Sequence, residues 1–187
     1  MRWLVVALSL TSLPVAALAQ EAPPAGTEDE PARTTEAPAE GQPRYLDAMR
    51  RELATMGVRN ATCEVDDAQR GHCAFTTRGV TTNRDFPVQA IYSDRTDTIY
   101  LFVGRYLTVP ADGDTTLALL RRLMELNWTL LLGKFEWDSA SGEVRLAMIL
   151  NTDSNFDRRA FRSAVRGIGQ LADRYYVELD RLQRGQR

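Results

Sequence analysis

The sequence contains very few of the residue types that metal centres use most. Its 187 residues include one histidine, His72, and two cysteines, Cys63 and Cys73. No second cluster of metal-ligating residues accompanies these three, so the usual closed site with four zinc ligands is not supported. The calcium-binding spacing of an EF-hand is missing, and so is a glycine-rich phosphate-binding loop. The sequence therefore predicts neither a metal nor a cofactor.

Catalytic motifs are lacking as well. His72 has no serine or aspartate partner at a recognised motif spacing. The aspartates at 66–67, 94–97 and 112–114 lie in expected turns, where aspartate is favoured for its backbone hydrogen bonding. We therefore predict a protein that is not an enzyme, and an enzyme with an unrecognised site is the alternative.

Long apolar runs are also missing, except near the first residue. Trp3 to Leu18 is mostly apolar and ends in Ala17-Leu18-Ala19, which has the small-x-small form of a signal-peptidase site. Pro14 interrupts this run, which is shorter than the roughly 20 apolar residues of a spanning helix. Gln20 follows in place of the cysteine that lipid attachment would need. We predict a signal peptide at 1–19, a periplasmic or secreted protein, and no stable membrane anchor.

Residues 20–43 contain no large apolar side chain and consist mainly of Pro, Ala, Glu, Thr and Gly. Such a composition buries too little surface to offset the entropy lost on ordering. We predict a disordered acidic linker here. The remaining stretch, 44–187, has about 144 residues, the size of one ordinary domain with its own core.

The two cysteines flank a short stretch with turn character, Asp66 to Gly71. In an oxidising compartment a disulfide between Cys63 and Cys73 is the default expectation. It would stabilise the protein by roughly 2–3 kcal/mol by restricting the unfolded chain. A metal site built from the two thiols and His72 is the alternative.

Charge is nearly balanced, with a formal net charge of −2, and Lys134 is the only lysine. A nucleic-acid partner is not expected for an exported domain of this charge. One cluster of positively charged side chains stands out, with its arginines at helical spacing. It is either a solvated helix face or a contact for an acidic protein segment or an anionic envelope polymer. If charge attracts the partner, the predicted binding residues are Arg158, Arg159, Arg162 and Arg166.

Apolar periodicity divides the folded part into three helices and six strands. We expect an α+β fold, an antiparallel sheet with helices packed on it, in the order α-β-β-β-β-α-β-β-α. The first four strands should form a meander. The helices are predicted over 44–56, 115–127 and 157–182, and the strands over 61–65, 72–77, 86–92, 98–106, 134–137 and 143–150.

The pattern also predicts the core. Leu117, Leu120 and Met124 share one face of the second helix, and we count them with the core. The hairpin of 134–137 and 143–150 should bury its apolar face against the last helix. The residues expected to pack there are Trp128, Phe135, Leu146 and Met148, with Phe161, Ile168 and Tyr175 against them.

The last helix carries apolar residues at alternating spacings of four and three. Such a seam either lies along one face of the sheet or pairs with a second copy. Because three heptads are few, we predict packing on the sheet, and a homodimer through the seam is the alternative. Asp153 or Ser154 is expected to cap the helix. The seam residues are Phe161, Val165, Ile168, Ala172, Tyr175, Leu179 and Leu182.

Four short motifs in this order resemble the YbjN domain family. They are Leu-Asn-Trp at 126–128, Gly-Lys-Phe at 133–135, Trp-Asp-x-x-x-Gly-Glu-Val at 137–144 and Ala-Asp-x-Tyr-Tyr at 172–176. The resemblance implies a fold similar to that of type III secretion chaperones. It also implies a non-enzymatic module, often described as a sensory transduction regulator, with protein binding by analogy to the chaperones.

The function that we predict combines these points. The chain should be an exported, non-enzymatic module of the bacterial cell envelope that binds a protein or peptide. The alternative is a structural or oligomerising envelope protein. Predicted export, the acidic linker and the cysteine pair distinguish the chain from a cytoplasmic secretion chaperone.

Overall fold

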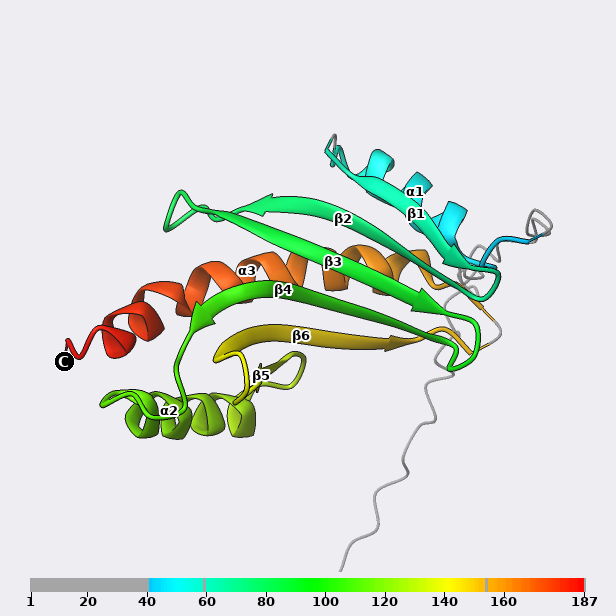
Figure 1. The fold of residues 1–187 in the computed structure, drawn as a ribbon. Coiled ribbons are helices and arrows are strands. Elements are labelled where there is room, and N and C mark those ends of the chain that lie inside the picture. Colours follow the sequence, from blue (N-terminus) through cyan, green and yellow to red (C-terminus); the bar gives the residue numbers. More distant parts are fainter. Residues whose placement is uncertain (1–40, 59, 154, 187) are drawn as a thin grey trace, which may run out of the picture. The chain divides into compact units, whose positions relative to one another are not determined.

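Six antiparallel strands form one sheet on which three helices pack (Figure 1). The structure is a computed structural model that describes residues 41–58, 60–153 and 155–186. The predicted signal peptide and most of the predicted linker lie outside the described residues. The α+β class and the predicted element order are confirmed. The elements are α1 (Leu46–Thr55), β1 (Thr62–Asp67), β2 (Arg70–Arg78), β3 (Asp85–Ser93), β4 (Thr98–Thr108), α2 (Thr116–Thr129), β5 (Lys134–Trp137), β6 (Glu143–Asn151) and α3 (Arg158–Gln183).

The strand order across the sheet is β1-β2-β3-β4-β6-β5. The first four strands form the predicted meander. The β5-β6 hairpin then returns so that β6 pairs with β4, with Leu101 opposite Met148, and the short strand β5 becomes an edge. No helix within the described ranges is both long and apolar enough to cross a membrane.

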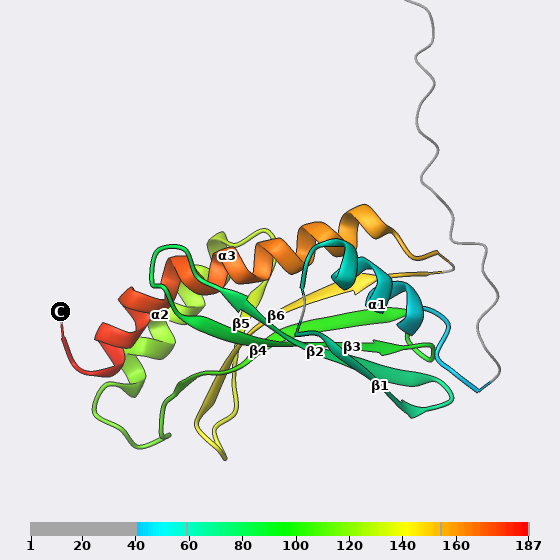
Figure 2. The same cartoon turned by 90° about the horizontal axis from the view of Figure 1, so that it is seen from above.

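The long helix α3 runs across one face of the sheet, with α1 beside its first half and α2 beside its last half (Figure 2). Its predicted seam faces the sheet: Phe161, Ile168 and Leu179 are completely buried. These seam residues therefore pack within the chain, as predicted. The predicted cap of α3, Asp153 or Ser154, was wrong. The helix is capped by Asp157, whose side chain accepts a hydrogen bond from the backbone N–H of Ala160 at 2.9 Å.

Most of the predicted core around the hairpin is confirmed, since Phe135, Leu146 and Met148 are buried. Trp128 is an error: it is 91% exposed. Helix α2 has apolar residues around most of its circumference, so periodicity offered two faces. The face that packs inward carries Leu119, Leu123 and Leu126, whereas Leu117 and Met124, predicted as core, point outward.

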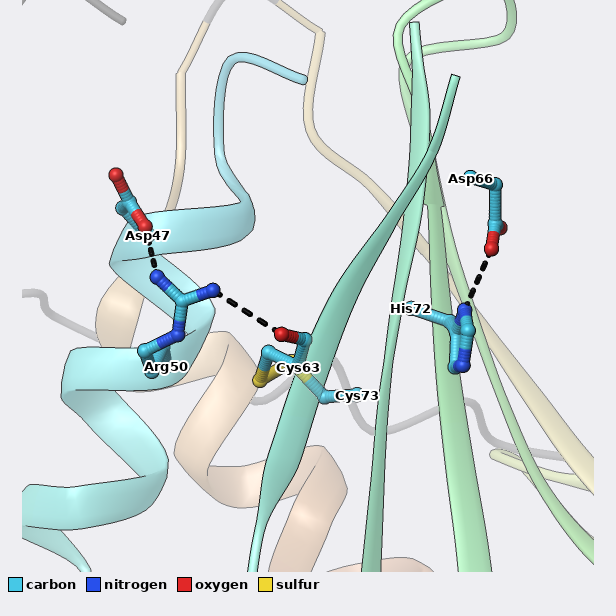
Figure 3. The surroundings of a disulfide bond; sticks show 6 residues. All are labelled: Asp47, Arg50, Cys63, Asp66, His72 and Cys73. Atoms are coloured by element: carbon cyan, nitrogen blue, oxygen red, sulfur yellow. Dashed lines mark hydrogen bonds and ion pairs between the residues drawn. A yellow bond between two sulfur atoms is a disulfide. The ribbon is translucent and has the colours of Figure 1, made fainter. Parts of the chain in front are cut away.

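A disulfide joins Cys63 on the edge strand β1 to Cys73 on β2, as predicted (Figure 3). Arg50 of α1 donates a hydrogen bond to the carbonyl of Cys63 at 3.1 Å. The Nδ1 atom of His72 lies 2.7 Å from Oδ1 of Asp66. With both sulfurs in the disulfide, the alternative metal site is lost. The described residues contain no other group of three His, Cys, Asp or Glu side chains that could hold a metal.

Candidate functional site

The predicted arginine stripe lies on the first turns of α3, next to α1. Two of its members are engaged within the chain, because they bind the carboxylate of Glu52 in α1, which is only 4% exposed. The Nε of Arg158 lies 3.5 Å from Glu52 Oε1, and Arg162 donates to Oε2. The hydrogen bond from Arg162 to Glu52 raises the pKa of Arg162 above its ordinary value. These two arginines therefore join α1 to α3.

The other two stripe residues remain on the surface. Arg159 and Arg166 are exposed, and neither forms an ion pair with any other described residue. Arg166 also lines a cavity that the sequence analysis did not predict. Binding of an acidic partner by the stripe stays a prediction.

The cavity lies between the carboxyl-terminal end of α1, the turn that joins β2 to β3, and the middle of α3. Its volume is about 820 Å³. Apolar side chains from all three segments line it, including Met56, Val80 and Val165. Arg78, Arg166 and Arg174 add three guanidinium groups, against a single carboxylate, Asp173. The described lining therefore combines apolar and polar side chains, with an excess of cations.

Asp173 of α3 fixes the turn that forms one wall. Its carboxylate accepts hydrogen bonds from the backbone N–H of Thr81 at 2.7 Å and of Thr82 at 2.9 Å, and from Thr82 Oγ1 at 2.6 Å. A side chain at Gly79 would collide with this carboxylate, so glycine is required there. Burial by itself raises the pKa of Asp173, but the hydrogen bonds from Thr82 and Thr81 outweigh it and lower the pKa to about 2. Asp173 is therefore an ionised anchor.

The three arginines of the cavity differ in their partners. Arg78 donates to Asn83 Oδ1 at 2.7 and 3.0 Å and pairs with Asp85 at 2.8 Å. Arg174 lies over the ring of Tyr175, 5.4 Å from its centroid. Within the described part of the chain, Arg174 and Arg166 have no carboxylate partner. They are the two cations left for a ligand.

A second surface feature is an apolar row along α2 and the turn that follows it, which we call the α2 apolar surface. It is formed by five large side chains that are at least 67% exposed. Trp128 and Leu131 are the most prominent, at 91% and 97%. From the sequence, the helical part of this row was predicted to lie in the core. Its members are Leu117, Met124, Trp128, Leu131 and Leu132.

A family model matches residues 46–181, from the start of α1 to near the end of α3. It is the YbjN model, described as "Putative bacterial sensory transduction regulator". The chain belongs to the YbjN family. The description names a regulator and no chemical reaction. Both the cavity and the α2 apolar surface lie within the matched YbjN region.

Comparison with solved structures finds a similar chain in the crystal structure of the ExsC-ExsE complex. The two share 15% sequence identity, and the match covers 72% of the present chain and 95% of the other, with a TM-score of 0.41. A likeness of this degree says nothing about what the YbjN domain described here binds. Comparison with curated proteins finds no match.

Proposed function

We propose that this YbjN-family chain is an exported, non-enzymatic module of the bacterial cell envelope that binds a partner protein or peptide on the α2 apolar surface. The observation that carries the proposal is the row of exposed apolar side chains from Leu117 to Leu132. Soluble proteins rarely expose contiguous apolar patches without using them as interaction sites. An exposed tryptophan is also typical of the residues that dominate binding energy.

The charges on this surface are few. Arg121 and Glu125 are exposed on the same face of α2, and Glu125 also contacts Arg122 at 3.1 Å. The surface is therefore close to neutral, which suits a partner that presents an apolar helix or strand. One basic and one acidic residue a single turn apart would also suit an antiparallel contact with a second copy. This observation favours self-association as the alternative function.

The test replaces the most exposed member of the row, in a Trp128→Glu variant, with Ile149→Glu as the matched control. Ile149 is an exposed apolar residue on β6, away from α2. Both changes should leave stability within about 0.5 kcal/mol, because the side chains are exposed. We expect Trp128→Glu to reduce capture of a stoichiometric partner from envelope extract at least tenfold, and Ile149→Glu to leave it unchanged.

Mass spectrometry of the captured material and light scattering of the purified chain separate the outcomes. A partner lost only with Trp128→Glu supports the proposal. Self-association that Trp128→Glu abolishes, without any other partner, replaces the proposal by the oligomerising alternative. Capture that survives Trp128→Glu contradicts the assignment of the surface.

Export itself is tested by the intact mass of the protein from its native host. The supporting observations are the signal-peptidase pattern at 17–19 and the disulfide, which suits an oxidising compartment. We expect a chain that begins at Gln20 or Glu21 and lacks the hydrogens lost in forming the disulfide. A chain that retains Met1, or thiols alkylated without a reductant, would contradict export.

A further inference from the structure

The cavity bounded by α1, the β2-β3 turn and α3 has the dimensions of a small-molecule site. Its volume of about 820 Å³ falls within the range of roughly 300–1,000 Å³ found for ligand pockets. The wall formed by the β2-β3 turn is held in place by Asp173, so it is built into the fold. The cavity is therefore pre-formed.

Four side chains in the lining can contact an apolar ligand body. Met56 and Val58 follow the end of α1, Val165 comes from α3, and Val80 lies at the tip of the β2-β3 turn. Val80 is 96% exposed. Val165 is already buried in the core, so a ligand would remove apolar surface from water mainly at Met56, Val58 and Val80. Such burial is the main source of affinity in ligand sites.

The polar groups in the lining favour an anionic head. Arg166 and Arg174 lack carboxylate partners among the described residues, and guanidinium groups bind carboxylates and phosphates with paired hydrogen bonds. The hydroxyl Oγ1 of Thr77, also in the lining, is buried and has no hydrogen-bond partner. This hydroxyl faces the backbone of α3 at Gly169 and is closed off from the cavity, so the two guanidinium groups are the polar groups that a head would meet.

Other ligand classes fit less well. The described lining contains no aromatic side chain on which a nucleotide base would stack. Its one carboxylate, Asp173, is already used by the β2-β3 turn, which leaves no acidic group for a cation.

The geometry points to a site for a small anionic amphiphile, an acyl chain with a carboxylate or phosphate head. The head is bound by Arg166 and Arg174.

The experiment titrates the folded chain with dodecanoate, dodecyl phosphate and dodecanol, each below its micelle concentration, in a calorimeter. We expect the two anions to bind and the alcohol to bind at least tenfold more weakly, because it lacks the charge. The comparison of the anions shows whether the head is a carboxylate or a phosphate. Raising the salt concentration should weaken binding of the anions.

The decisive variant is Arg166→Gln combined with Arg174→Gln, and Arg159→Gln is the matched control. Arg159 is exposed on the same helix but does not line the cavity. We expect the double variant to lose at least tenfold in affinity for dodecanoate and the control to lose none. Circular dichroism confirms that both variants are folded.

The inference is overturned if neither anion binds, if dodecanol binds as well as dodecanoate, or if the double variant binds dodecanoate as tightly as the parent does. A tetrapeptide of apolar residues with a free terminal carboxylate is tested in parallel. If this peptide binds and both amphiphiles fail, the cavity is a peptide site and the amphiphile is the wrong ligand. These results are independent of partner capture by the α2 apolar surface.

Discussion

Replacing Phe135 by alanine is expected to lower the free energy of unfolding by about 3–5 kcal/mol, as for other buried aromatic side chains. Phe135 is 6% exposed, and its ring centroid lies 5.7 Å from that of Tyr106 and 6.3 Å from that of Tyr175. Its backbone also exchanges two hydrogen bonds with the Asn127 side chain, at 2.7 and 3.0 Å. The residue therefore holds both the edge strand β5 and helix α2 to the core.

Urea denaturation of the two proteins gives the difference, and Trp128→Ala provides the control. Both residues are aromatic and lie near the junction of α2 and β5, but Trp128 is exposed, so its truncation should change stability by less than about 0.5 kcal/mol. A loss below about 1 kcal/mol for Phe135→Ala would show that β5 does not pack on the core. Similar losses for the two variants would contradict the orientation of α2.

The parts of the fold that could be predicted from the sequence are those with one clear pattern. In α3, the alternating spacing from Phe161 to Leu182 marks a single apolar face, and that face packs on the sheet. The β5-β6 hairpin has a single alternating pattern with a turn between its strands, and β5 was predicted to the residue. The two cysteines offered one pairing, and Cys63 and Cys73 form it.

Helix α2 could not be oriented from its sequence, because the burial of Leu119 rather than Leu117 depends on β5 and α3, which come later in the chain. The contacts of the arginine stripe could not be predicted either. Its spacing was visible, but the partner of Arg162 is Glu52, 110 positions earlier. The cavity draws on residues 56–58 and 60 and on the segments 76–81 and 165–174, and no local sequence pattern indicates that these meet.

Removing the carboxylate of Asp173 is expected to be the next most damaging change, at about 2–3 kcal/mol for Asp173→Ala, because hydrogen bonds to a charged group are among the stronger ones. The residue is 7% exposed and connects α3 to a turn 91 positions earlier. Without it, the N–H groups of Thr81 and Thr82 lose their acceptor. The wall of the cavity should then loosen, with faster amide hydrogen exchange at 79–82 as the local sign.

The dependence on pH distinguishes an ionised anchor from a neutral one. The pKa of Asp173 in the folded chain is about 2, below its ordinary value of 3.8. Its contribution is therefore fully present above about pH 4 and is lost as the pH falls towards 2. Urea denaturation should show the stability gap between the parent and Asp173→Asn narrowing over this range. Asp85→Asn, which removes an exposed carboxylate, is the control for general acid effects. A gap that stays constant from neutral pH to about pH 2 would mean that the turn does not depend on the ionised carboxylate.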